Sequence, residues 1–222
     1  MLDKLSEFFK KRGWKEKFSI GRKKAKKVLG RFKKNDKFEL DKEAMELLEF
    51  YGIEVAEFRV ARSIEDVYVA AKEIGYPVVL KTLTSRAVHR GDAGGVAVVK
   101  SPEEVKEAYP QVLGEIFTRM PWLLLEGVLV QAFIDGDKKL WLKLERAQKK
   151  VLPFKVWKKD DGGESEKVIS SEEELEGYLS DEYLEGVFAF FMDFPEIRKL
   201  EADFVEKDGE KILVDSKLYL FE

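Results

Sequence analysis

The sequence Tyr76-Pro-Val-Val-Leu-Lys81 runs directly into Thr82-Leu-Thr-Ser-Arg-Ala-Val-His-Arg-Gly-Asp-Ala-Gly-Gly-Val96. The apolar run before Lys81 does not alternate with polar residues, which is typical of a strand in a sheet covered on both faces. A lysine that ends such a strand can project its ammonium group into a cleft and neutralise a phosphate. A surface position at a strand end is the commoner case for a lysine taken alone, so the residues that follow must distinguish the two.

The loop after Lys81 contains a pair of adjacent glycines, Gly94 and Gly95. Glycine lets the backbone approach a ligand and direct N–H groups at phosphate oxygens, although an ordinary hairpin turn explains the pair equally well. The intervening residues add a carboxylate, two guanidinium groups and the only imidazole of the chain: Asp92, Arg86, Arg90 and His89. A neutral imidazole can accept a phosphoryl group or act as a general base near pH 7. The loop lacks G-x-x-x-x-G-K-[S/T], so it predicts phosphate chemistry of a kind other than a P-loop.

Helices and strands alternate around this loop. Capping residues and one-sided apolar stripes indicate helices that start near Asp41, Ser63 and Ser101, and a further helical region from 171 to about 193. The expected strands cover residues 55–60, 76–81, 96–100, 127–134, 139–146, 151–157, 200–206 and 211–221. We expect residues 127–146 to form a hairpin and residues 160–166 a loop or linker. Alternation first and hairpins later predict a two-lobed α+β or mixed α/β fold.

Composition narrows the class of protein. The 222 residues are 45% hydrophobic and 37% charged, which excludes general disorder and fits the ion-pair networks of heat-adapted proteins. Cysteine is absent, so disulfides, thiolate zinc sites and cysteine nucleophiles are excluded. No apolar run approaches the roughly 20 residues that cross a bilayer, and the first residues lack the apolar centre of a secretion signal. We therefore expect a soluble, cytoplasmic protein.

The charge is distributed unevenly along the chain. Residues 1–37 hold 15 Lys and Arg against 4 Asp and Glu, a balance of +11, so the remaining residues carry 25 minus 39, or −14. Such a basic arm can bind nucleic acid, an anionic membrane surface or an acidic partner. The alternative is a partly helical tail that docks on the acidic remainder of the chain, and the arm matches no known nucleic-acid motif.

A second set of candidate residues lies in the expected C-terminal hairpin. Magnesium bound with a nucleotide needs one or two carboxylates besides phosphate oxygens, and Glu201, Asp203 and Asp215 can supply them from neighbouring strands. A two-residue turn at Asp208-Gly209 would place Asp203 opposite Val214 and leave Asp215 on the other face. A turn with an odd residue count would bring the carboxylates together, and Asp-Gly permits both. Solvent-facing charges on an edge hairpin are the structural alternative.

Several of these segments together resemble the β subunit of ADP-forming acetyl-CoA (acyl-CoA) synthetases, a family with the ATP-grasp fold. The resemblance is carried by residues 40–52, 76–81, 88–96, 101–105 and 127–131, and it returns at 192–197 and 212–215. It implies a first ATP-grasp lobe over residues 38–130 that contains the glycine loop, and a second lobe over 131–222 that contains the metal site. The basic residues 1–37 would then form a helical extension that precedes both lobes.

The resemblance also implies a chemistry. The family makes ATP from acyl-CoA, ADP and phosphate, or runs in reverse, through a phosphohistidine on a CoA-binding α subunit. In this sequence His89 matches a histidine that relays the phosphoryl group, and Asp203 and Asp215 match the magnesium ligands. The residues assigned to ATP or ADP are Lys81, Arg90, Gly94, Gly95 and Gln131. An α-type subunit is the expected partner, with a homodimer as an alternative.

The chain departs from the family pattern at several positions. Ala132 and Lys139 stand where acidic residues are usual, and Lys143 stands where glycine is usual. The Phe-Gly-Pro and glycine-rich segment expected after Arg146 is missing. Lysines near a metal–nucleotide site repel magnesium. These departures motivate a second hypothesis, a catalytically degenerate relative that acts in interaction or regulation, while the basic arm motivates a third, a nucleic-acid-binding protein.

Overall fold

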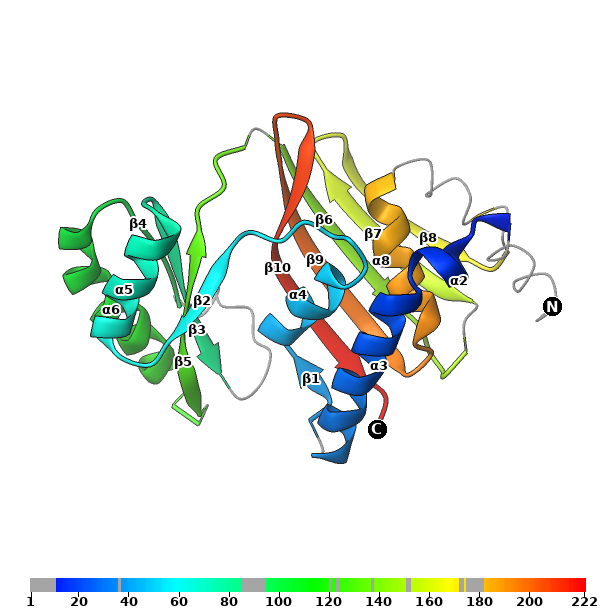
Figure 1. Ribbon diagram of the computed structural model, residues 1–222, viewed down its shortest axis with the longest axis horizontal. Helices are drawn as coiled ribbons and strands as arrows, with labels where there is room; N and C mark the ends of the chain where they lie inside the picture. Colours follow the sequence, from blue (N-terminus) through cyan, green and yellow to red (C-terminus); the bar gives the residue numbers. More distant parts are fainter. Residues whose placement is uncertain are drawn as a thin grey trace. The chain divides into compact units, whose positions relative to one another are not determined.

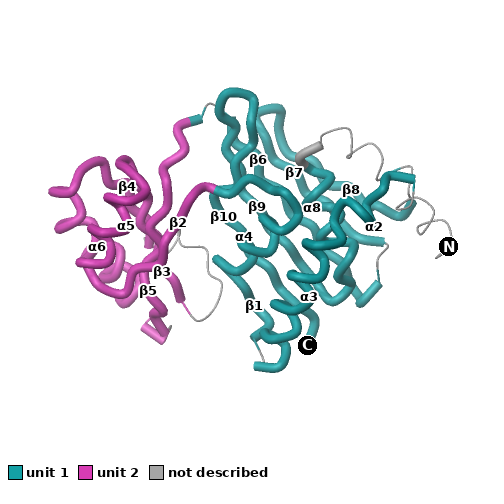
Figure 2. The backbone as a smooth tube through the Cα atoms, in the orientation of Figure 1, with its two compact units in different colours: residues 1–55, 136–222 teal, residues 56–135 magenta. Residues whose placement is uncertain are grey.

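Two sheets organise the chain, each within its own compact unit (Figure 1). The computed structural model describes residues 11–35, 37–84, 95–119, 121–122, 124–136, 138–150, 153–171, 174 and 182–222. Unit 1 comprises residues 1–55 and 136–222, and unit 2 comprises residues 56–135 (Figure 2). Unit 2 is therefore inserted, in sequence, between the two segments of unit 1.

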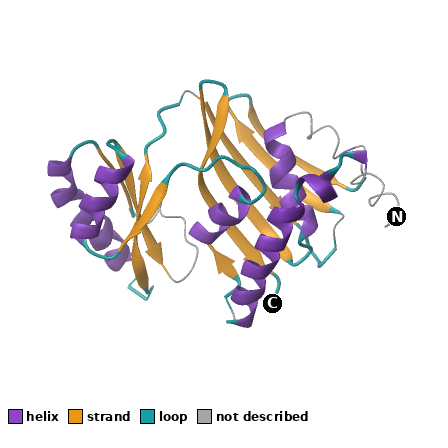
Figure 3. Cartoon of the chain, in the orientation of Figure 1, coloured by secondary structure: helices purple, strands orange, loops and turns teal. Residues whose placement is uncertain are grey.

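Unit 2 is a four-stranded antiparallel sheet with two helices on one face (Figure 3). In spatial order, its strands are β2 (Phe58–Ala61), β5 (Leu125–Ala132), β3 (Val78–Thr84) and β4 (Val96–Val99), and its helices are α5 (Ile64–Ile74) and α6 (Pro102–Arg119). Ser63 and Asp66 form the capping box expected at the start of α5, and the helix stops at Gly75. The core between helices and sheet includes Val78 and Leu80 of β3.

Unit 1 is built on a six-stranded antiparallel sheet. In spatial order, its strands are β1 (Glu39–Leu40), β10 (Glu210–Leu220), β9 (Ile197–Lys207), β6 (Lys138–Glu145), β7 (Phe154–Asp160) and β8 (Gly163–Ile169). Its helices are α2 (Trp14–Lys17), α3 (Ser19–Lys34), α4 (Lys42–Glu49) and α8 (Glu182–Asp193), and α3, α4 and α8 lie over the same face of the sheet (Figure 1). Apolar side chains alternate along β6, where Leu140, Leu142 and Leu144 are buried. Alternation leaves the other face of this sheet polar.

The described part of the basic arm, residues 11–35 and 37, belongs to unit 1 and packs against the rest of that unit. Gly21, Ala25 and Leu29 of α3 are buried and recur every four residues, which places them on one side of the helix. Trp14 is also buried, and its indole N–H donates to Glu185 of α8. This packing matches the docked-tail alternative, while neither the structure nor the comparisons below support nucleic acid as a partner.

Three sequence expectations about the chain order differ from the structure. Residues 127–146 do not form a hairpin, because β5 pairs with β2 and β3 in one sheet whereas β6 pairs with β9 and β7 in the other. Residues 160–166 are not a linker: β7 and β8 form a hairpin around a turn at Asp161 and Gly162. Residues 38–55, expected in the first lobe, group with unit 1 because β1 pairs with β10 and α4 packs on β10.

Among the described residues, no helix combines the length and the apolar character needed to cross a membrane.

Candidate functional site

In unit 2, strand β3 presents Lys81 on the face opposite the helices. Lys81 is paired with Val96 of β4 and Leu129 of β5. Because side chains alternate along a strand, Lys81 lies on the other side of the sheet from Leu80, which packs in the helix-covered core. The side chain is nevertheless buried, with 8% of the residue exposed. Burial of an ammonium is costly unless it is compensated, so this position differs from an ordinary surface lysine at a strand end.

Gln131 lies on the same face of this sheet as Lys81. It is paired with Val79, two residues before Lys81, so the two side chains occupy diagonal positions whose Cβ atoms lie about 7–8 Å apart. Gln131 is 1% exposed, and its Nε2 donates to the carbonyl oxygen of Ala56 at 3.4 Å. The structure thus brings together two of the residues assigned to nucleotide binding.

Gly95 sits at the start of β4, where its glycine character has an internal explanation. Its carbonyl oxygen accepts a hydrogen bond from the backbone N–H of Thr82 at 2.9 Å. A Cβ atom at this position would lie 2.3 Å from Oγ1 of Thr82 and 3.0 Å from Cγ1 of Ile116 in α6. Close packing therefore requires a glycine here even without a ligand.

The remaining loop residues lie outside the described part of the chain. These are His89, Arg90 and Gly94, together with Arg86 and Asp92. Their assigned roles in phosphoryl relay and phosphate binding therefore stay predictions.

In unit 1, Asp203 of β9 and Asp215 of β10 are directly opposite one another in the ladder. Directly opposed side chains share a face, with Cβ atoms about 4.5–5.5 Å apart. The turn between the strands is the two-residue turn Asp208-Gly209, with both residues at positive φ, and by itself it would have placed Val214 opposite Asp203. A bulge between Leu213 and Asp215 absorbs Val214 and restores the pairing of the carboxylates.

The bulge coincides with a second chain segment at the edge of β10. The backbone N–H of Leu213 donates to the carbonyl oxygen of Glu54 at 2.8 Å, and Val55 forms an isolated parallel bridge with Leu213. The segment that follows α4 thus accepts a hydrogen bond from Leu213, the residue before the bulge. No turn residue in the sequence signals this contact, which explains why sequence reasoning left the register open.

Charged and aromatic side chains surround this carboxylate pair on the same face of the sheet. Glu201 is paired with Lys143 of β6 and with Lys217 of β10, and Asp203 is also paired with Trp141. Glu201 forms an ion pair with Lys199 at 3.1 Å. Sequence reasoning missed Trp141 and, on the neighbouring strand, Trp157 as members of this face. Their alternation with buried residues such as Leu142 and Val156 was the available signal.

The donor set suits a magnesium ion that arrives with nucleotide phosphates. Such an ion needs one or two carboxylates from the protein, which Asp203 and Asp215 offer from one face. Throughout the described ranges, no cluster of three or more His, Cys, Asp or Glu side chains offers a cage for a metal by itself. Asp203 and Asp215 thus fit a cation that is carried by a nucleotide.

A known protein family matches the part of the chain that contains Lys81 and Gln131. The family described as the ATP-grasp domain matches residues 31–149, more than half of the chain. The chain belongs to the ATP-grasp family. The matched range of the ATP-grasp chain includes Lys81, the loop with His89, Gly95 and Gln131, whereas Asp203 and Asp215 lie beyond it.

Curated relatives of this ATP-grasp chain include ADP-forming acetate–CoA ligases. The ADP-forming acetate–CoA ligase I of Archaeoglobus fulgidus is 36% identical over 128 residues, which are 58% of this chain and 19% of that protein. The β subunit of the Pyrococcus furiosus ADP-forming acetate–CoA ligase I is 37% identical over 108 residues, 48% of this chain and 47% of that subunit. The aligned part therefore spans less than half the length of these curated relatives.

A solved structure extends the likeness over most of the ATP-grasp chain. It is the dinucleotide-forming acetyl-coenzyme A synthetase 1 of Ca. Korarchaeum cryptofilum, in complex with coenzyme A, Ca-AMPCP and HgCl+. The two are 25% identical with a TM-score of 0.73, over 89% of this chain and 100% of the solved one.

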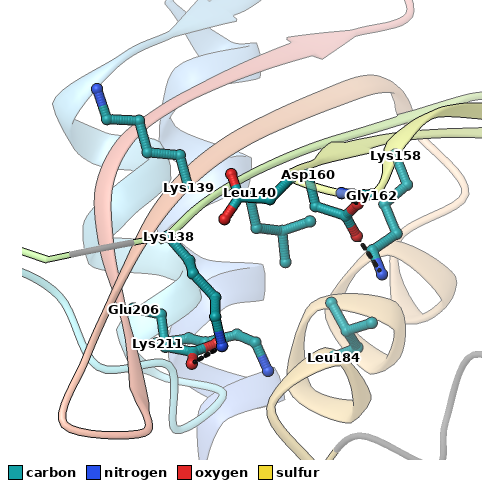
Figure 4. Close-up of a pocket in the computed structure, with 10 residues that line it drawn as sticks. Lys138, Lys139, Leu140, Lys158, Asp160, Gly162, Leu184, Glu206 and Lys211 are labelled. Carbon is teal, nitrogen blue, oxygen red and sulfur yellow. Dashed lines mark hydrogen bonds and ion pairs between the residues drawn. The ribbon is translucent and has the colours of Figure 1, made fainter.

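A cavity of about 400 Å³ lies at the end of the unit 1 sheet, near the two hairpin turns (Figure 4). Four lysines line it, but Lys138 pairs with Glu206 at 3.0 Å and Lys158 pairs with Asp160 at 2.9 Å. Lys139 extends away from these pairs in Figure 4, and its cross-strand partner is Val205 and not Asp203. In the ladder, Lys139 and Lys143 therefore both lie diagonal to Asp203, on either side of Trp141.

Proposed function

We propose that the chain binds ADP or ATP and serves as the nucleotide-binding, β-type subunit of an ADP-forming acyl-CoA synthetase, an acid–thiol ligase. The observation that carries the proposal is the placement of Lys81 and Gln131, both buried, on the face of the unit 2 sheet that α5 and α6 do not cover. The family match over residues 31–149 and the acetate–CoA ligase relatives support the same activity.

The roles in this proposal fall on residues of both units. Lys81 neutralises phosphate charge, and Arg90, Gly94 and Gly95 complete the phosphate-binding loop, with Gln131 as a further nucleotide contact. Asp203 and Asp215 hold magnesium, which, when bound, shields the phosphate oxygens from one another. His89 accepts a phosphoryl group on an imidazole nitrogen and passes it to or from the partner.

The partner we propose is a CoA-binding α-type subunit, which gives a hetero-oligomer. Support comes from the Pyrococcus furiosus relative, which is itself named as a β subunit, and from the Korarchaeum structure, which is described with bound coenzyme A. The acyl substrate would then be chosen largely on the partner, so this chain would not determine it.

Nucleotide binding by the purified chain tests the proposal. Mg-ADP at 100 times its Kd should stabilise the protein by about 2.7 kcal/mol and raise the melting temperature. Lys81→Met should weaken ADP binding by at least about tenfold, since a charge-assisted hydrogen bond contributes about 1.5–3 kcal/mol. Lys72→Met is the matched control, because Lys72 is exposed on α5 in the helix layer of the same unit.

The outcome that would sink the proposal is simple to observe. A chain that shows no melting shift and no calorimetric signal at saturating Mg-ADP and Mg-ATP does not bind nucleotide. Where binding is found, CoA-dependent ATP formation after addition of an α-type subunit, and its loss in His89→Asn, test the ligase and relay steps separately.

A further inference from the structure

A restrained ammonium group lies on the same face of the sheet as the proposed magnesium carboxylates. The Nζ atom of Lys143 is 3.0 Å from Oε2 of Glu145 and 4.0 Å from the ring centroid of Trp157, and only 22% of its side chain is exposed. Lys143 is directly opposite Glu201 and therefore diagonal to Asp203, about 7–8 Å away between Cβ atoms. An ion pair and a cation–π contact together restrain a side chain that is otherwise long and mobile.

The aromatic partner of Lys143 is itself held in place. Trp157 is on β7, where it lies opposite Lys143 of β6 and opposite Glu166 of β8. A hydrogen bond from Lys155 above all, followed by the charge of Lys155, a hydrogen bond with Trp157 and the charge of Lys143, outweighs desolvation and keeps the pKa of the exposed Glu166 carboxyl below its usual range. Glu166, Trp157 and Lys143 therefore form a connected row across three strands.

The lysines change the charge that a polyphosphate would meet around the carboxylate pair, on the face formed by residues 139–145, 199–205 and 215–217. Four carboxylates lie there on adjacent strands, on Glu145, Glu201, Asp203 and Asp215. Four ammonium groups lie on the same face, on Lys139, Lys143, Lys199 and Lys217. The balance is 4 minus 4, or 0, whereas the carboxylates alone would present −4. An anionic ligand needs a divalent cation most where the carboxylates around it are not balanced by positive side chains.

We propose that Lys143 acts as a built-in cation that takes over part of the charge neutralisation a magnesium ion would provide. Nucleoside di- or triphosphate binding on this face then depends only weakly on divalent metal. This inference rests on the proposed nucleotide-binding function and names a residue that sets its metal requirement. It concerns binding and not phosphoryl transfer.

The test is calorimetric titration of the full chain with ADP, in excess magnesium and in EDTA. We expect the wild-type Kd to change by less than about threefold between the two conditions. Lys143→Gln removes the charge and should raise the Kd in EDTA by on the order of tenfold, the effect of one charge at roughly 7 Å in a medium of intermediate dielectric constant. Excess magnesium should recover most of that loss.

Lys155→Gln is the matched control. Its Nζ atom also approaches the Trp157 ring, at 5.4 Å, but the side chain is 52% exposed and pairs with Glu166. The strand order places Lys155 on β7, one strand farther from Asp203 than Lys143. It should leave the metal dependence of binding unchanged. Circular dichroism of both variants establishes that the fold is intact.

The outcomes separate this inference from the proposed function. A wild-type chain that binds ADP tightly in magnesium but loses more than about tenfold affinity in EDTA overturns the inference and leaves the proposed function standing. Equal effects of Lys143→Gln and Lys155→Gln also overturn it, because a general surface charge would explain them. A wild-type chain that binds no ADP in either condition refutes the proposed function itself. If Lys143→Gln does not fold, the wild-type comparison of magnesium and EDTA still decides.

Discussion

At the scale of single residues, two different reasons can be given for a glycine at position 95. From the sequence, the Gly94-Gly95 pair suggested close approach of the backbone to a phosphate. In the structure, a side chain on Gly95 would collide with Thr82 and with Ile116 of α6. The two reasons are compatible, but the packing reason holds without any ligand, and it can be measured on the free protein.

We predict that Gly95→Ala destabilises the chain by about 1–3 kcal/mol, the usual cost of overpacking a well-filled core. Gly114→Ala is the matched control, because Gly114 lies inside α6 and a methyl group added there would meet no atom within 4 Å. Alanine is the better helix former, so this control should be neutral or stabilise by up to about 1 kcal/mol. Urea denaturation measures both. Equal stability of the two variants would remove the packing explanation.

The carboxylate pair marks the limit of sequence reasoning at this scale. Parity along a strand predicts, for the two-residue turn that the structure contains, that Asp215 lies on the face opposite to that of Asp203, and this is not observed. What it could not supply was the bulge at Val214, next to Leu213, whose N–H bonds to Glu54. Leu213 and Glu54 lie far apart in the sequence, so no local pattern connects them. Sequence reasoning therefore named two residues that are opposite one another in the ladder, but not the geometry that pairs them.

At the scale of elements, α2 and α3 place part of the arm's positive charge in ion pairs with carboxylates of unit 1. Glu185 of α8 receives the indole N–H of Trp14 and an ion pair from Lys17, and Arg22 pairs with Asp193 at 2.8 Å. Burial raises the pKa of Glu185, but the hydrogen bonds from Lys17 and Trp14 outweigh it and leave the pKa below the ordinary value of 4.5. The carboxylate is thus more stable when the arm is docked.

This lowered pKa gives a pH prediction. Because the folded pKa is lower than the unfolded one, Glu185 contributes stability that is fully present above about pH 4.5 and is lost as the pH falls through the folded pKa. Glu185→Gln should cost about 1–3 kcal/mol at pH 7 and progressively less as the pH falls through the lowered folded pKa, where the wild-type carboxyl becomes protonated. Glu206→Gln, whose partner Lys138 is 63% exposed, should cost under about 1 kcal/mol.

Urea denaturation at about pH 7 and about pH 3.5 measures these differences. A cost of Glu185→Gln that is the same at both pH values would contradict the assignment.

Element types were more predictable than pairings. Caps and apolar periodicity placed α4, α5 and α6, and the expected strands appear within a few residues of their predicted positions, whereas β1 and β8 were not expected. The errors concern which strands meet. Residues 127–146 read as a hairpin because two strand patterns flank Asp135-Gly136, yet β5 already has a neighbour on each side. Local patterns carry no information about an edge that a distant strand has filled.

At the scale of the whole molecule, the chain passes from unit 1 into unit 2 and back. Unit 2 is continuous over residues 56–135, and its core is formed by its own residues, among them Val67, Leu80, Val105 and Val130. Unit 1 needs both of its segments, because β1 from the first pairs with β10 from the second and α4 packs on the same strand. The unexpected grouping of residues 38–55 follows from this pairing.

The arrangement predicts that the units fold with different requirements. Residues 56–135 expressed alone should fold, since a continuous segment with its own core is within the size range of independent domains. Residues 136–222 expressed alone should not, because β10 would lose β1 and its buried face would lose α4. Joining residues 1–55 to 136–222 through a short Gly-Ser linker should restore that fold. Circular dichroism and thermal melting of the three proteins measure this. An unfolded 56–135 fragment would contradict the expectation that unit 2 is stabilised by its own core alone. A stable 136–222 fragment would contradict the expectation that unit 1 needs both of its segments.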